Sequence, residues 1–403
     1  MAIEMIETEE LNQGTQIKVI GVGGGGGNTV NHMIDCKVQG VEFICANTDA
    51  QALAHSRAHK TIQLGPGRGA GGKPDVGRKT AEMSEDSIRA CIDGAHMLFI
   101  TAGMGGGTGT GAAPVVARVA RAMGILTVGV VTKPFDWEGG KRTVQAEAGL
   151  AELEANVDSL IVILNEKLLE ELGDDITQDQ AFGQANDVLK NAVGGIAEII
   201  NDYGQVNVDF EDVRTVMAEP GKAMMGTAMA SGPDRARIAA EQAVACPLLE
   251  GVDLSGAKGV LVLITASKDS LKLKESKAAM ETIRAYAAAD ANVIFGAAYD
   301  ESLGDEMRVT VVATGLSRQQ KPGLSVVPTY ETAAATGTYG YAPGMAVGNA
   351  VDPASIPTYQ RVGKPDVWGT HPSRVNASAK VNALASGGMD DFEIPAFLRR
   401  QAD

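Results

Sequence analysis

The chain has 403 residues, a formal net charge of −15, 44% hydrophobic residues and 4% aromatic residues. This length accommodates two compact domains and further sequence, while the negative charge excludes a sequence-independent nucleic-acid binder and argues against direct adhesion to anionic lipid. The four cysteines form no CxxC pair and are expected to be reduced thiols of a cytoplasmic protein, and no apolar run is long enough to predict membrane insertion.

The first glycine-rich segment follows a predicted strand. Residues 1–16 are polar and acidic and are expected to form a flexible tail, whereas Ile17 to Val22 form an apolar strand. A helix is expected from Thr29 to about Lys37, so unpaired N–H groups at its start would bind an anionic ligand. We therefore assign the following residues to a nucleotide-binding turn: Gly24, Gly25, Gly26, Gly27 and Asn28.

The same segment allows an alternative interpretation. Residues 21–26 satisfy the G-x-G-x-x-G pattern of dinucleotide-binding folds, with Glu42 or Asp49 as the acid that binds a ribose. An NAD-dependent oxidoreductase therefore stays open. A dinucleotide site needs one glycine turn, however, and this chain has a second one.

The next predicted elements add polar groups on the same side. Val41 to Ala46 form a strand, and Asn47 and Asp49 follow at its carboxyl end, where open α/β sheets bind ligands. Residues 65–74 resemble a P-loop, but Pro74 replaces the Mg²⁺-binding hydroxyl. We predict instead a phosphate-side loop in which Ala70 and Gly71 present backbone amides, followed by one helix over 76–93.

The second glycine run is the strongest motif. Met97 to Thr101 form a buried strand, and a helix is expected from about Ala112 with Pro114 in its first turn. The residues between them combine glycines, which allow close approach, with hydroxyl donors. The candidate ligand-binding residues here are Gly105, Gly106, Gly107, Thr108, Gly109 and Thr110.

Strand and helix signals continue to alternate up to residue 172. Strands are expected at 125–132 and 157–164, and the alternation predicts a doubly wound, mostly parallel sheet. Glu138 and Arg142 stand four residues apart at a helix start. They would form either a surface ion pair or a carboxylate on ribose hydroxyls with a neighbouring guanidinium.

A long helix is predicted over 177–203, opened by the capping box of Thr177 and Gln180. It is apolar on more than one side and is expected to be buried between two bodies. Phe182 is either core or a platform for a base, with Asn186 and Asp187 beside it. A carboxylate can accept hydrogen bonds from guanine N1–H and the 2-amino group together.

Polar and acidic residues gather after this helix. Asn207, Asp209 and Asp212 lie between apolar runs, and at least one acid is expected to cap the next helix. The glycine turns supply phosphate contacts but no group that orients or deprotonates water, which hydrolysis requires. These residues are therefore the catalytic candidates.

The rest of the chain divides into three parts. Residues 204–316 predict a smaller α/β domain, with strands at 222–230, 259–265, 293–298 and 307–314 and helices at 233–245 and 269–288. Residues 317–388 have the composition of a disordered linker. Residues 389–403 combine an apolar cluster with flanking charges and are expected to be a docking peptide.

Three motifs together resemble the tubulin/FtsZ family, and in particular its bacterial FtsZ members: GGGTGTG continued by GAAPVV, the poly-glycine turn and NVDFEDV. The resemblance implies a GTP-binding domain at 17–176, a central helix at 177–203 and a C-terminal GTPase-activating, polymerising domain at 204–316. It implies GTP or GDP as the nucleotide, and Mg²⁺ held mainly by phosphates and water. No side chain is assigned to a metal.

The resemblance also assigns roles to residues. Glu138 and Arg142 would lie on the ribose and phosphate side, and a guanine-binding group would consist of Phe182, Asn186 and Asp187. The motif of Asn207, Asp209 and Asp212 would complete the nucleotide site of the next subunit in a head-to-tail homopolymer, where the two carboxylates polarise the attacking water.

The resemblance implies a cell-division function as well. The filament would form the cytokinetic ring at midcell, and the peptide 389–403 would bind the membrane-linked adaptors FtsA and, where present, ZipA. A non-catalytic, nucleotide-gated scaffold stays open as an alternative, which Asp209 and Asp212 disfavour.

Overall fold

The computed structural model describes residues 14–172, 176–201, 208–219, 221–245, 256–288 and 290–316, which all lie within one compact unit. Most of the predicted tail, the linker 317–388, the peptide 389–403 and Asn207 lie outside the described residues. Within the described ranges, none of the helices combines the length and apolar character that a transmembrane span requires.

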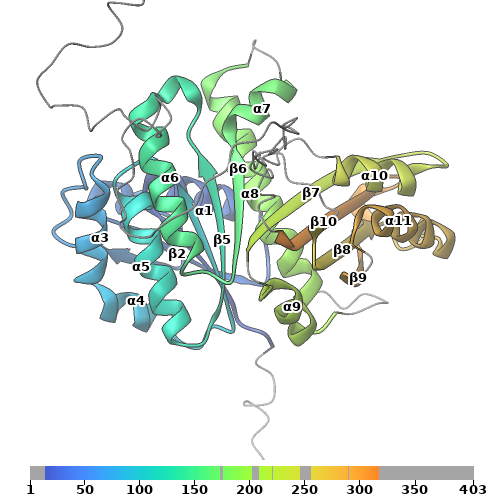
Figure 1. Cartoon of the computed structure of the whole chain (residues 1–403), viewed down its shortest axis with the longest axis horizontal. Coiled ribbons are helices and arrows are strands. Elements are labelled where there is room, and N and C mark those ends of the chain that lie inside the picture. Colours follow the sequence, from blue (N-terminus) through green and yellow to red (C-terminus); the bar gives the residue numbers. More distant parts are fainter. Residues whose placement is uncertain are drawn as a thin grey trace, which may run out of the picture. The chain divides into compact units, whose positions relative to one another are not determined.

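Ten strands form one sheet in the order β3-β2-β1-β4-β5-β6-β7-β10-β8-β9 (Figure 1). The strands of the first half are β1 (Ile17–Val22), β2 (Val41–Asn47), β3 (Lys60–Gln63), β4 (Met97–Gly103), β5 (Leu126–Lys133) and β6 (Ser159–Leu164). All of them pair in parallel. The chain turns to one side of β1 for β2 and to the other for β4, so a switch point lies at the carboxyl ends of β1 and β4. This confirms the predicted doubly wound fold.

Helices cover both faces of this half. They are α1 (Gly23–Asp35), α2 (Ala50–Ala54), α3 (Pro74–Glu82), α4 (Glu85–Ile92), α5 (Thr108–Ala122), the short η1 (Asp136–Glu138), α6 (Gly140–Glu154), α7 (Asn165–Leu172) and α8 (Gln178–Asn201). Val30 and Met33 of α1 pack with α8 against one face of the sheet. The opposite face is covered by α3, α4, α5 and α6.

The second half has mixed topology. Its elements are α9 (Phe210–Met217), β7 (Lys222–Ala230), α10 (Arg235–Val244), β8 (Gly259–Ala266), α11 (Leu273–Tyr286), β9 (Asn292–Tyr299), η3 (Glu301–Leu303) and β10 (Met307–Leu316). β10 pairs antiparallel with β7 and β8, whereas β9 is parallel to β8. The four predicted strands are present, but they do not form a separate sheet. β6 and β7 pair through Leu160 with Lys222 and Ile161 with Ala223.

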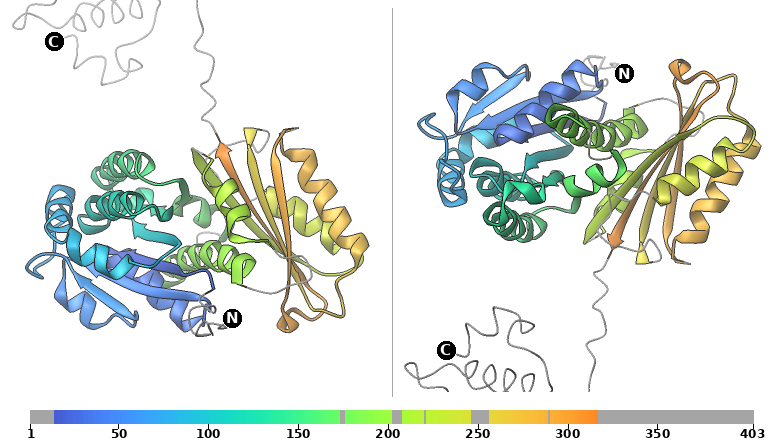
Figure 2. Two further views of the ribbon diagram at one scale, coloured as in Figure 1. Left: turned by 90° about the horizontal axis from the view of Figure 1, so that it is seen from below. Right: turned by 90° about the horizontal axis from the view of Figure 1, so that it is seen from above.

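Helix α8 belongs to a core that both halves share. Ile196 is fully buried in a cluster that contains Phe99 of β4 as well as Leu261 of β8 and Val312 of β10. Figure 2 shows α8, in green, between the two halves. The prediction of a helix buried between two bodies is therefore confirmed.

Two predictions of secondary structure between residues 60 and 93 were wrong. β3 was missed because only Ile62 of its four residues is buried, which leaves no alternating pattern. The single helix over 76–93 is instead α3 and α4, interrupted near Ser84. The Ser84 hydroxyl donates to the Thr80 carbonyl in the last turn of α3, and the Thr80 hydroxyl donates to the carbonyls of Val76 and Gly77 earlier in the helix, so side-chain donors compete with backbone N–H groups along α3. Glu85 and Asp86 then favour a new helix N-terminus.

Candidate nucleotide-binding site

A cavity of about 460 Å³ opens at the carboxyl ends of β4 and β5, beside the N-termini of α1 and α5. It brings together candidates from four separate segments of the sequence. The predicted residues that line it are Gly24, Gly25, Asn28, Gly106, Gly107, Thr108, Gly109, Glu138, Arg142, Phe182 and Asn186. Open α/β folds bind ligands at the switch point of the sheet. In this protein the N-termini of α1 and α5 both lie at that point.

The first glycine run is helical rather than a loop. α1 begins at Gly23, not at Thr29, so Gly24 to Asn28 form its first turns. The reason is packing, because a Cβ on Gly26 would collide with the Thr101 carbonyl of β4. The glycines let α1 lie directly on the sheet, and the N–H groups of its first turn have no partner within the helix. Gly26 and Gly27 face this packing and do not line the cavity.

The second run also becomes helical earlier than expected. α5 begins at Thr108, so Pro114 lies in the second turn and not in the first. Its ring leaves the Thr110 carbonyl without the usual helical donor. Gly105 has a φ of +93° and its N–H donates to the Thr110 hydroxyl at 2.9 Å. These two residues therefore brace the loop, while Gly106 to Gly109 line the cavity.

The loop at 65–74 lies against this second run. A Cβ on Gly107 would come within 2.9 Å of the Ala70 Cβ and 2.8 Å of the Lys73 nitrogen. The loop is fixed to the end of β2 by the Gly69 N–H, which donates to the Thr48 carbonyl at 2.8 Å. Thr48 and Thr108 share a hydroxyl hydrogen bond of 2.6 Å.

The residues predicted in and beside this loop do not line the cavity itself. Ala70 contacts the glycine run, but the Cβ position of Gly71 has no neighbour within 4 Å among the described residues. Asn47 accepts a hydrogen bond from the Asp49 N–H, and the Asp49 carboxylate accepts one from the Gln51 N–H as the N-cap of α2. Their assignment to a ligand stays a prediction.

Glu138 and Arg142 form the ion pair that their spacing allows, while contact of Glu138 with a ribose stays a prediction. Arg142 donates to Glu138 in an ion pair, and both side chains line the cavity. Glu138 also accepts a hydrogen bond from the Phe135 N–H at 3.0 Å, and its side chain is 10% exposed. The carboxylate is thus held at the rim, where its orientation is fixed by two partners.

An aromatic row borders the cavity. Phe182 is 37% exposed, so it is not a core residue, and it meets the buried Phe135 edge-to-face with ring centroids 5.4 Å apart. Phe135 in turn stacks on the exposed Trp137 at 5.7 Å. A half-exposed ring with a fixed edge is suited to contact a planar base.

Asn186 and Asp187 point to different partners. The Asn186 Oδ1 accepts from the Thr29 hydroxyl at 2.8 Å and lies at the cavity. Asp187 does not line the cavity and instead meets His32 at 3.0 Å and Lys190 at 3.1 Å. Burial raises the pKa of Asp187, but the hydrogen bonds with His32 and Lys190 outweigh it and hold the pKa below its ordinary value.

The acidic candidates lie elsewhere. Asp209 is the N-cap of α9, and its carboxylate accepts from the Asp212 N–H at 2.8 Å, which confirms that one of the acids caps a helix. Both residues are exposed, and neither lines the cavity of its own chain.

Sequence reasoning missed Asn165. It is buried, it lines the cavity, and within the described part of the chain its Oδ1 has no hydrogen-bond partner. A buried acceptor without a donor is costly unless a ligand supplies one. Its position directly after β6 is the one signal that could have found it, since ligands bind at strand carboxyl ends. The other cavity residues outside the predictions are Thr29, Gly103, Met104, Thr132, Pro134, Ala185 and Leu189.

Comparison with known proteins accounts for this arrangement. The model of the tubulin/FtsZ family GTPase domain matches residues 16–173, and that of the FtsZ family C-terminal domain matches residues 221–317. The chain is 50% identical over 400 residues to the cell division protein FtsZ of Pseudomonas aeruginosa, covering 98% of this chain and 99% of that protein. The chain belongs to the FtsZ family. It is therefore a GTPase of that family, and the oxidoreductase and non-catalytic scaffold alternatives fall away.

Further relatives agree with this membership. The cell division protein FtsZ of Wigglesworthia glossinidia brevipalpis is 46% identical and covers 99% of this chain and 100% of that protein. A solved structure of an empty FtsZ dimer from M. jannaschii is 42% identical with a TM-score of 0.72, covering 76% of this chain and 90% of that one. A GDP-bound CetZ1 monomer from Haloferax volcanii, at 20% identity and a TM-score of 0.66, shares the fold.

Proposed function

We propose that this FtsZ family member binds GTP in the cavity and hydrolyses it after head-to-tail assembly, when Asp209 and Asp212 of one subunit reach the nucleotide of the next. One observation carries the proposal. Among the described residues that line the cavity, Glu138 is the sole acid, and Arg142 holds it. The cavity thus offers anion binding without a group to activate water, while two exposed acids stand outside it.

The lining suggests how the nucleotide lies. The phosphates would bind at the N-termini of α1 and α5, where N–H groups and helix dipoles favour negative charge. The ribose hydroxyls would meet Glu138 and Arg142. The base would contact Phe182, with Asn165 and Asn186 as polar partners. Asp187 would read the guanine N1–H and 2-amino group after releasing His32.

The cation would depend on the nucleotide. Because the described lining contains no carboxylate cluster, Mg²⁺ would be held mainly by phosphate oxygens and water. When bound, it would neutralise charge on the transferring phosphoryl group. The chain's own contribution is the orientation of the triphosphate by the two glycine runs.

The geometry of α9 supports the role of the acids. Asp209 is fixed by its capping hydrogen bond, which leaves its second oxygen for water. Asp212 lies in the first turn of α9, and among the described residues its carboxylate has no partner. Two carboxylates held on one exposed helix end can orient a water and accept its proton.

The test is phosphate release measured against protein concentration with GTP and Mg²⁺, with light scattering on the same samples. We expect the rate per subunit to rise from near zero above a threshold, together with scattering. Asp212→Ala should keep GTP binding and lose most hydrolysis, whereas the neighbouring exposed acid variant Glu211→Ala should stay active. A rate per subunit that is independent of concentration, without scattering, would contradict a shared site.

The cellular role follows from the same proposal. The polymer would form the cytokinetic ring at midcell in the cytoplasm, tethered by FtsA and, where present, ZipA through the peptide 389–403. Deleting this peptide should abolish adaptor binding and leave GTP turnover unchanged. A large fall in turnover would place the peptide in the catalytic body instead.

A further inference from the structure

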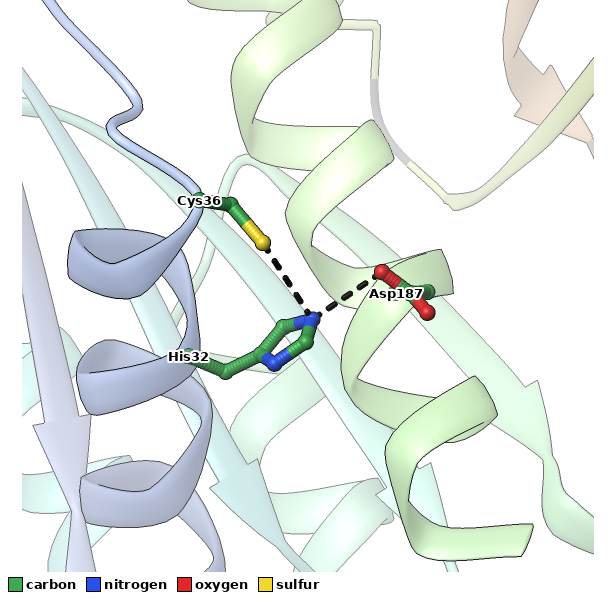
Figure 3. A group of neighbouring side chains, drawn as sticks. All are labelled: His32, Cys36 and Asp187. Atoms are coloured by element: carbon green, nitrogen blue, oxygen red, sulfur yellow. Dashed lines mark hydrogen bonds and ion pairs between the residues drawn. The ribbon is translucent and has the colours of Figure 1, made fainter. Parts of the chain in front are cut away.

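Three side chains with metal-binding atoms converge between the C-terminal end of α1 and α8 (Figure 3). The His32 Nε2 lies 3.0 Å from the Asp187 Oδ1 and 3.7 Å from the Cys36 Sγ. One atom of each residue lies within 4.8 Å of the others. The sequence analysis assigned no side chain to a metal, because Asp187 is distant in the chain from the other two residues and comes from α8.

The fold holds these residues together. Cys36 is the C-cap of α1, four residues after His32, and its N–H donates to the His32 carbonyl at 2.9 Å, so the two side chains lie on the same side of the helix. The helix ends at Asp35, with Cys36 as its C-cap, in a Schellman motif in which the Val38 N–H donates to the Met33 carbonyl at 3.1 Å. One turn earlier, the hydrogen bond between Thr29 and Asn186 fixes α1 against α8 independently of the cluster.

We propose that His32, Cys36 and Asp187 form a three-ligand site for a thiophilic divalent transition-metal ion such as Zn²⁺, bridging α1 to α8. Imidazole, thiolate and carboxylate are the side-chain ligands of Zn²⁺, and tetrahedral bond lengths would place nitrogen and sulfur about 3.6 Å apart and nitrogen and oxygen about 3.3 Å apart. The observed separations of 3.7 and 3.0 Å are near these values.

The donor set selects the class of metal. A thiolate excludes Mg²⁺ and Ca²⁺, which take oxygen ligands, and favours soft or borderline ions. The Cys36 thiol releases its proton to solvent as the metal–sulfur bond forms. Cys36 is exposed, so water can occupy the fourth position.

Lys190 opposes the metal. Its Nζ lies 3.1 Å from the same Asp187 oxygen that faces His32. The ammonium group would be displaced or would repel the cation. Removing the positive charge of Lys190 should therefore strengthen metal binding. A cluster that does not bind metal would show no such effect.

The site also has a consequence that rests on the proposed function. If Asp187 reads guanine, a metal that holds its carboxylate competes with the nucleotide. Metal and GDP should then weaken each other's binding by the same factor, because coupling between two sites is reciprocal.

The direct test uses Co²⁺ as the probe on the full-length protein without nucleotide or Mg²⁺. Thiolate ligation gives a sulfur-to-cobalt charge-transfer absorption, which we expect in the wild type and not in Cys36→Ser. Cys91→Ser is the matched control and should retain it, since this half-buried thiol lies outside the cluster. Absence of the absorption in the wild type at saturation, or its persistence in Cys36→Ser, overturns the proposal.

Two further variants test the other ligands and the electrostatics. Asp187→Asn should weaken Co²⁺ binding about tenfold or more, and Lys190→Gln should tighten it. Unchanged affinity in Asp187→Asn overturns the three-ligand site. Circular dichroism shows whether each variant is folded.

The effect of Zn²⁺ on GDP affinity distinguishes a failure of the metal-site proposal from a failure of the proposed function. Zn²⁺ should lower GDP affinity in the wild type and leave it unchanged in Cys36→Ser. A cobalt spectrum that depends on Cys36, with GDP affinity unaffected by Zn²⁺, upholds the metal site and overturns the guanine role of Asp187. A wild type that binds no GDP even without metal overturns the proposed function alone.

Discussion

At the scale of single residues, the cavity depends on polar atoms that the protein itself does not satisfy. Asn165 is the clearest case, because its buried Oδ1 faces the cavity and has no donor among the described residues. Asn186, in contrast, already accepts from Thr29. The first acceptor therefore awaits a ligand, and the second positions one helix against another.

We predict that Asn165→Leu weakens GDP binding by about 5- to 30-fold, since a hydrogen bond to the ligand contributes about 1–2 kcal/mol. Thermal stability should change little because no protein donor is lost. The measurement is GDP titration by calorimetry alongside thermal unfolding. Asn156→Leu, outside the cavity, is the control for nucleotide affinity, which it should leave unaltered.

The sequence predicted those side-chain contacts that depend on local spacing, but not those that depend on long-range packing. Thr177 and Gln180 form the predicted capping box, with reciprocal bonds of 2.9 and 3.2 Å, because this motif is read from local spacing. Asn165 was missed because a lone asparagine after a strand has no motif. Only the long-range packing around it shows that its oxygen is buried and unpaired.

At the scale of elements, glycine misled the prediction of helix starts. α1 and α5 begin inside their glycine runs, although glycine disfavours helices by about 1 kcal/mol per residue. Packing decides the outcome, since a side chain at Gly26 or Gly111 would collide with the backbone of Thr101 or Pro74. The strands of the second half were predicted within a few residues because apolar residues predominate in each of them.

The residue that follows the C-cap of α1 has a strained backbone. Lys37 occupies the left-handed region with a φ of 56°, which costs a residue with a side chain about 1–2 kcal/mol. Lys37→Gly should relieve this strain and raise the free energy of unfolding by about 1 kcal/mol, measured by urea denaturation. Lys37→Ala keeps the Cβ and should give no gain; an equal gain in both variants would rule out a backbone origin.

Helices α10 and α11 are joined by a buried ion pair. The Arg235 side chain is 5% exposed and donates to Glu275 at 2.8 Å and to the Asp305 carbonyl at 2.8 Å. The hydrogen bond from Arg235 lowers the pKa of Glu275 against the effect of burial.

Because the folded-state pKa of Glu275 is lowered, its contribution to stability is present above the ordinary value of 4.5 and is lost as pH falls through the folded value. Glu275→Gln should cost about 2–4 kcal/mol at neutral pH and reduce the loss of stability in acid. Urea unfolding at several pH values measures both effects. The exposed pair of Arg237 and Glu241 supplies the control, and Glu241→Gln should leave the free energy of unfolding nearly unchanged because solvent screens this pair.

At the scale of the molecule, the two halves of the sheet are connected by the pairing of β6 with β7 and by the hydrophobic core around α8. The seam between β6 and β7 has only two residue pairs, so it contributes little. The shared core on α8 is much larger and includes side chains from strands of both halves. Cooperative folding of the two halves should therefore depend on this helix.

Ile196→Ala tests this dependence. Removing a fully buried isoleucine from the shared core should cost about 2–5 kcal/mol and lower the unfolding midpoint of both halves together. Calorimetry and far-UV circular dichroism should follow one transition. Val144→Ala, at an exposed position of α6, should have little effect, and two separated transitions in the Ile196 variant would show that the halves fold independently.

The aromatic row described at the cavity has an optical consequence. The ring of Trp137 stacks on Phe135, whose edge meets Phe182, so a change at the cavity reaches an indole through two ring contacts. Arrival or departure of a base on Phe182 should alter the intrinsic fluorescence of Trp137. Nucleotide exchange in this protein can then be followed in real time without a label, and Trp137→Phe should silence that signal.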